Sequence, residues 1–155
     1  MSKEFLILVI VWLISIGILL KYIPKESKRT AYITFLFVQA IAWFYEYMQV
    51  LFKCVEYPYR EFPIATKMSF SMHYLIYPTF GVFFIILYPL DKGKLREFIH
   101  TLLFAVAVST YTLLIEHYSS LIEFKNWNWY LCLISNFIIL YIIKKFVFWF
   151  KKGLA

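Results

Sequence analysis

The stretch KMSFSMHYLIYP (residues 67–78) decides how this chain folds, because it sets a histidine and a proline into an otherwise apolar segment. Ionisable side chains are costly in hydrocarbon, so His73 is expected to have a partner that satisfies it. Proline has no N–H and clashes with the carbonyl four residues earlier, so Pro78 should kink the helix and loosen the carbonyl of Tyr74. The stretch therefore predicts a polar site within a kinked helix.

The rest of the chain has the composition of an integral membrane protein. Its 155 residues are 63% hydrophobic and 16% charged, with a mean hydropathy of +0.71, whereas soluble domains are about 45–50% apolar and about 25% charged. Long apolar runs are separated by short charged gaps, which leaves no room for a soluble domain of even about 50 residues. We expect an all-α, polytopic helix bundle that forms a single transmembrane domain over residues 1–155.

Five apolar segments are the predicted transmembrane helices. They cover residues 5–20, 31–52, 68–88, 98–122 and 129–143. The fifth is short before Lys144 and Lys145, so it either continues through FVFWF (146–150) or is a tilted or half-inserted helix. The first segment has no small-residue cleavage site and is interpreted as a retained span. The longest loop, residues 53–66, is a candidate lid.

The distribution of basic residues predicts the orientation, because cytoplasmic loops carry an excess of Lys and Arg. With the N-terminus outside, the cytoplasmic side holds 11 of the 16 basic residues, namely Lys21, Lys25, Lys28, Arg29, Lys92, Lys94, Arg96, Lys144, Lys145, Lys151 and Lys152. The net charge of +7 is therefore explained by contacts with lipid headgroups, and we expect no nucleic-acid partner. The prediction is an N-out, C-in, multi-pass protein of the cell membrane.

Three ionisable residues in different predicted spans form the candidate catalytic group, Glu46, His73 and Glu116. With a rise of about 1.5 Å per residue, each lies roughly 7 to 9 Å outward of the middle of its span, so all three are at one depth. We expect them to face a shared interior cavity, with side-chain atoms of at least two within about 8 Å. Pro78 should lie beneath them, and Tyr77, one turn from His73, should line the cavity floor.

The residues expected to bind a ligand around this group are polar or aromatic. They are Lys67, Tyr77, Trp43, Asn126, Trp129 and Asn136. Two carboxylates and an imidazole are also able to bind a divalent metal, but HExxH, phosphate-loop and nucleophile-elbow motifs are absent, so no cofactor is assigned. Cys54 and Cys132 have neither metal nor redox spacing, and we do not expect them to form a disulfide.

Three motifs carry a resemblance to a known family. They are FYEY (44–47), HYLIYPTFGVFF (73–84) and IEHYSSLIEFKNWNWY (115–130). Together they resemble a family of small, uncharacterised multi-spanning membrane proteins of spore-forming Firmicutes. The resemblance implies a membrane bundle and singles out Glu46, His73, Tyr77, Pro78, Glu116 and Trp129, but it implies no activity.

Two functions from different classes fit these features. In the first, an outward-side pocket binds, and transforms by acid–base chemistry, a lipidic or isoprenoid molecule, because desolvated carboxyl groups suit a general acid and aromatic walls stabilise cationic charge. In the second, the chain is a non-enzymatic envelope protein, such as a complex subunit, an immunity factor or an assembly factor, whose polar groups tune helix packing within a homo-oligomer or with a membrane partner. Ion conduction ranks third, because GVFFIILY (81–88) offers no polar path.

Overall fold

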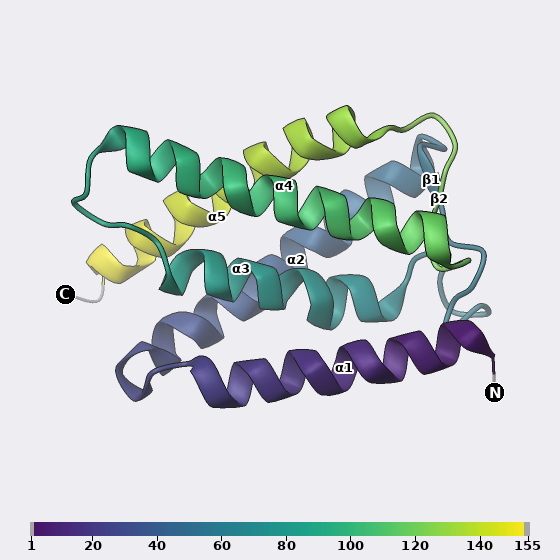
Figure 1. The fold of residues 1–155 in the computed structure, drawn as a ribbon, viewed down its shortest axis with the longest axis horizontal. Coiled ribbons are helices and arrows are strands. Elements are labelled where there is room, and N and C mark those ends of the chain that lie inside the picture. Colours follow the sequence, from purple (N-terminus) through teal and green to yellow (C-terminus); the bar gives the residue numbers. More distant parts are fainter. Residues whose placement is uncertain (1, 154–155) are drawn as a thin grey trace.

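The computed structural model describes residues 2–153, in which five helical segments run alternately in opposite directions (Figure 1). They are α1 (Lys3–Tyr22), α2 (Lys28–Leu51), the continuous pair η2 (Met72–Ile76) and α3 (Tyr77–Ile86), α4 (Lys94–Tyr118) and α5 (Trp129–Gly153). A short turn of 3-10 helix, η1 (Lys25–Ser27), joins α1 to α2. The all-helical class predicted from the sequence is confirmed.

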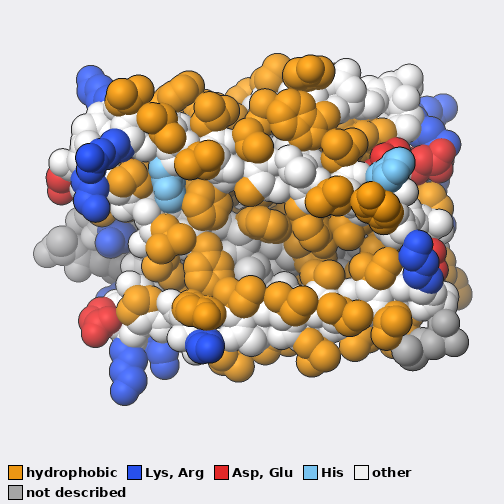
Figure 2. Space-filling model, viewed as in Figure 1, with side chains coloured by type: hydrophobic (Ala, Val, Ile, Leu, Met, Phe, Trp, Pro, Cys, Tyr) orange, Lys and Arg blue, Asp and Glu red, His pale blue; other side chains and the backbone are white. Residues whose placement is uncertain are grey.

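Three of the helices, α1, α4 and α5, are long and apolar enough to cross a membrane. α2 has 24 residues but carries Gln39, Glu46 and Gln49. The segment Met72–Ile86 is shorter, about 22 Å at the rise of an α-helix, against about 30 Å of hydrocarbon. On the face drawn in Figure 2, hydrophobic side chains form a broad central band and charged side chains gather toward the two ends, as expected for a membrane protein.

The last helix continues through its lysine pair and through FVFWF (146–150), while its insertion in the membrane stays a prediction. α5 is unbroken from Trp129 to Gly153. Lys144 is accommodated because its Nζ lies 2.6 Å from Oε2 of Glu97 and 4.8 Å from the ring centroid of Tyr88. The Tyr88 hydroxyl donates to the same Glu97 oxygen at 3.0 Å. An ion pair and an aromatic ring thus allow a lysine inside an apolar helix.

The contact between α2 and α3 depends on a glycine. A Cβ added at Gly81 would lie 2.6 Å from Cγ2 of Val38, well inside van der Waals contact. Val38 and Phe84 both belong to a buried cluster that includes residues of α4 and α5. The absence of a side chain at Gly81 therefore lets α2 approach α3 and brings the polar residues of the two helices within reach of each other.

The loops at one end of the bundle are tied to each other, which the sequence did not predict. Two short strands, β1 (Val55–Glu56) and β2 (Glu123–Phe124), pair in antiparallel fashion (Figure 1). The backbone N–H of Tyr59 also donates to the carbonyl of Ser120 at 2.9 Å. The candidate lid, residues 53–66, is thus joined to the α4–α5 connection. Cys54 and Cys132 are both free thiols, as expected.

Candidate functional site

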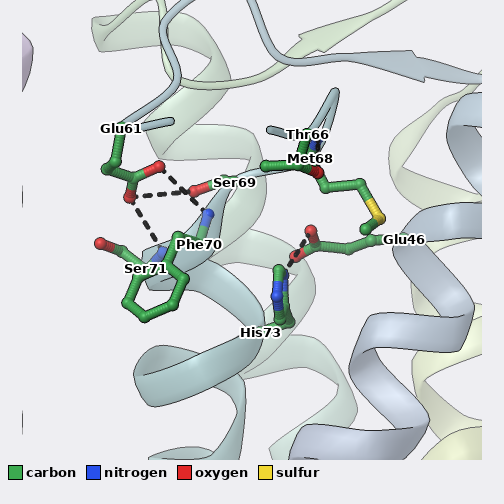
Figure 3. A network of polar contacts seen from close by, with 8 residues as sticks. All are labelled: Glu46, Glu61, Thr66, Met68, Ser69, Phe70, Ser71 and His73. Carbon is green, nitrogen blue, oxygen red and sulfur yellow. Dashed lines mark hydrogen bonds and ion pairs between the residues drawn. The ribbon is translucent and has the colours of Figure 1, made fainter. Parts of the chain in front are cut away.

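Glu46 of α2 and His73 of η2 form a buried pair between two helices. Oε2 of Glu46 lies 3.1 Å from Nδ1 of His73 (Figure 3). The exposed fractions of the two side chains are 0% for Glu46 and 4% for His73. The second carboxyl oxygen of Glu46, Oε1, is buried and has no hydrogen-bond partner among residues 2–153. The expectation that at least two of the three candidate groups would lie within about 8 Å is confirmed by this pair.

His73 lies in a π-helical turn next to Pro78. The N–H of Tyr77 bonds to the carbonyl of Met72, five residues earlier, and such turns inside α-helices are frequent at functional sites. Because Pro78 has no N–H, the carbonyl of Tyr74 lacks its usual helical donor. Nε2 of Gln39 supplies one at 2.8 Å. The predicted loosening of the Tyr74 carbonyl is confirmed, and its new partner comes from α2.

Tyr77 lies away from the opening that His73 lines. Tyr77 lines two interior cavities of about 30 and about 10 Å³, each with room for only one or two water molecules. The expectation of a ligand-sized interior cavity floored by Tyr77 is therefore wrong, while the stripe through His73 and Tyr77 stays a prediction.

The opening beside His73 lies on the outer surface of the bundle instead. A shallow groove of about 550 Å³ runs between α2 and η2. Its lining residues are Leu36, Gln39, Ala40, Trp43, Phe44, His73 and Tyr74. Since Nδ1 of His73 faces Glu46, the other ring nitrogen, Nε2, is the atom left for a molecule in the groove. The predicted ligand residue Trp43 lies in this groove, where it is 48% exposed and stacks on Tyr47.

The start of the helix that carries His73 is held by a carboxylate that sequence reasoning missed. Oε2 of Glu61 accepts from the N–H of Phe70 at 3.1 Å, and Oε1 accepts from the N–H of Ser71 at 2.9 Å (Figure 3). Free N–H groups at a helix start are satisfied by such acceptors. The Ser71 hydroxyl in turn accepts from Nε1 of Trp12 at 2.7 Å. An acidic residue in the loop before the helix was the available signal, but eight residues separate it from Phe70.

Glu116, the third member of the predicted group, does not join the pair. Within residues 2–153, neither an ion pair nor a hydrogen bond links its side chain to Glu46 or His73. Glu116 is partly exposed near the end of α4, and His117 is exposed with its ring against Tyr118. Depth along a helix was the basis for grouping Glu116 with the pair, but depth does not fix the direction in which a side chain points.

The remaining candidates have separate positions. Lys67 is exposed, and the exposed Asn126 donates to the carbonyl of Lys53 at 3.4 Å. Trp129 is partly exposed at the start of α5. Asn136 is buried and donates to Oγ of Ser109 at 3.0 Å and to Sγ of Cys132 at 3.3 Å. These contacts join loops or pack α4 against α5, so they lie apart from the Glu46–His73 pair.

A metal centre has no support in the described part of the chain, where no group of three or more His, Cys, Asp and Glu residues is arranged to hold an ion. A comparison with protein families, with curated proteins and with solved structures found no match to this chain. The resemblance to small membrane proteins of spore-forming Firmicutes therefore stays a prediction, and the function has to be argued from the geometry alone.

Proposed function

We propose that this chain is a five-span protein of the cell membrane, with its N-terminus outside, that binds a lipidic or isoprenoid molecule in the groove beside His73. The alternating directions of the helices support five crossings. The gathering of basic residues at the end where α1 stops and α2 begins supports the orientation. In this topology the groove opens sideways toward the lipid, so an apolar ligand enters without crossing water.

One observation carries the proposal: a buried histidine forms part of an otherwise largely apolar groove while its other face is bonded to a fully buried carboxyl group. An ionisable pair at such a position is costly, and intramembrane ionisable groups mark binding or transport sites by default. The apolar walls, Leu36 and Phe44, suit a hydrocarbon chain, and Nε2 of His73 suits a hydroxyl or another polar head. Glu46 fixes the ring orientation through Nδ1.

A chemical step is the second candidate, because a histidine held by a carboxyl group is a common acid–base device. Nε2 of His73 would accept a proton from a ligand hydroxyl, and Glu46 would stabilise the imidazolium that results. Glu116 has no part in this step, since it lies apart from the pair. The non-enzymatic alternative assigns the Glu46–His73 pair to helix packing only. Detection of a bound ligand would distinguish a binding site from this packing role.

The test is the lipid that accompanies the purified protein. The double variant Glu46→Met with His73→Phe removes both polar partners and keeps their approximate volumes, so no buried charge is left unpaired. The matched control, Glu97→Met with Lys144→Met, does the same to the pair at the other end of the bundle. Mass spectrometry of extracted lipid should find one enriched species in wild type and control that is missing from the Glu46 and His73 variant. Equal lipid in all three would assign the pair to packing.

A further inference from the structure

A second groove lies at the opposite end of the bundle from His73, where α1 stops and α2 begins. It has a volume of about 270 Å³ and is lined by apolar residues of three helices and by one lysine, Lys28. Its walls include Leu20 and Tyr32, which are 81% and 70% exposed, and its floor includes Ala31 and Val82, both buried. Exposed apolar side chains are able to contact a hydrocarbon chain, and the adjacent lysine is able to bind an anion.

The basic side chains around this groove are not neutralised by acidic side chains. Lys21, Lys25, Lys28 and Arg29 lie within ten residues that contain one carboxylate, Glu26. No ion pair within residues 2–153 involves any of the four, and Nζ of Lys21 lies 5.4 Å from the ring centroid of Tyr22. An excess of unpaired cations next to an apolar groove favours a ligand that brings its own negative charge.

The start of α2 adds to the same preference. The backbone N–H of Lys28 is already bonded, because η1 runs directly into α2 and this N–H donates to the carbonyl of Lys25. The side chain of Lys28, the first residue of α2, lines the groove. This side chain brings a cation to the apolar walls.

We propose that this groove binds an anionic glycerophospholipid, with its phosphate against the side chain of Lys28. One acyl chain lies along Leu20, Tyr32 and Phe35 toward Val82. The apolar length of the groove favours a whole lipid over a free phosphate, and the uncompensated charge favours an anionic headgroup over a zwitterionic one. This site is separate from the groove beside His73 and does not depend on the function proposed for that groove.

Native mass spectrometry of the full-length protein, titrated in detergent with phosphatidylglycerol or phosphatidylcholine, tests the proposal. We expect phosphatidylglycerol to bind more tightly to wild type, and Lys28→Gln to reduce that preference by about five-fold, which corresponds to about 1 kcal/mol for one basic residue. Lys94→Gln is the matched control, because Lys94 is also an exposed first residue of a helix but lines none of the described grooves. That variant should keep the preference.

Two outcomes would overturn the proposal. If wild type binds both lipids equally, or if Lys28→Gln and Lys94→Gln lose the preference to the same extent, the charge acts over the whole surface and not at this groove. If glycerol phosphate in solution displaces phosphatidylglycerol, the site recognises a headgroup alone. The Glu46→Met and His73→Phe double variant should retain the preference, which separates this site from the groove beside His73.

Discussion

The bundle contains two acid–base pairs between helices, near opposite ends, and they differ in how completely they are satisfied. Glu97 accepts hydrogen bonds from both Lys144 and Tyr88. The side chains of Glu97 and Lys144 are 27% and 23% exposed. Glu46 is fully buried, one of its oxygens has no partner, and His73 keeps a ring nitrogen for the groove. The first pair is a complete structural contact, while the second leaves a buried carboxyl oxygen without a hydrogen-bond partner within residues 2–153.

Removing one partner should lower the free energy of unfolding far more for the Glu46–His73 pair than for the Glu97–Lys144 pair. This is the largest effect we expect. His73→Ala leaves the fully buried Glu46 without a donor, which costs about 3–5 kcal/mol of unfolding free energy. Lys144→Ala leaves a carboxylate that reaches solvent and still accepts from Tyr88, so the loss should be about 1 kcal/mol or less. Thermal unfolding in detergent, followed by circular dichroism, measures both. Equal losses would show that the two pairs are equivalent.

Removing both partners of the buried pair should restore most of the lost stability. In the Glu46→Met and His73→Phe double variant no charge is left unpaired, so its unfolding free energy should be within about 1 kcal/mol of wild type. The same thermal measurement checks this prediction. A double variant as unstable as His73→Ala would mean that the pair itself holds α2 against η2, and that it is a structural contact like Glu97 with Lys144.

The close approach of α2 to α3 at Gly81 allows the buried pair to form. Adding a side chain at Gly81 should therefore lower the free energy of unfolding. Gly81→Ala places a methyl group 2.6 Å from Cγ2 of Val38, and such overpacking costs about 1–3 kcal/mol. Gly17→Ala is the matched control, because an added Cβ there meets nothing within 4 Å and alanine is favoured over glycine in a helix by about 1 kcal/mol. Chemical unfolding of the two variants should therefore give shifts of opposite sign.

The smallest effect concerns the carbonyl that Pro78 leaves free. Gln39→Leu removes its donor and should cost about 1 kcal/mol. Pro78→Ala restores an N–H that can bond to the Tyr74 carbonyl, so Gln39→Leu should cost much less in that background. A double-mutant cycle measures this coupling. Additive losses would show that Gln39 does not act through the Tyr74 carbonyl.

The proximity of Glu46 and His73 was predictable from the sequence, whereas the positions of Tyr77 and Glu116 were not. Counting residues along each apolar segment predicted that Glu46 and His73 would lie near each other, and proline chemistry identified the Tyr74 carbonyl. Tyr77 lines interior cavities and not the groove that His73 lines, and Glu116 is not bonded to the pair within residues 2–153. Both outcomes depend on the rotation of a helix about its own axis, which is set by contacts between helices and not by spacing within one of them.

The contacts made by the loops were also not predictable from the sequence. Glu61 satisfies the start of the helix that carries His73, and β1 pairs with β2 across nearly seventy residues of chain. Neither contact follows a local pattern, because each depends on the path of a connector between two fixed helix ends. The aromatic and proline content of residues 53–66 indicated an interfacial loop but gave no information about its partners.

Photo-crosslinking from the groove tests the central claim most directly. With p-benzoylphenylalanine in place of Leu36, which lines the groove beside His73 and is 60% exposed, we expect one dominant lipid adduct by mass spectrometry. The same group in place of Leu103, which is 63% exposed on α4, should capture a mixture that mirrors the bulk membrane. Adding Glu46→Met and His73→Phe should turn the adduct at position 36 into that mixture. The same lipid mixture at both positions, or an adduct unchanged by the double variant, would contradict a ligand site at His73.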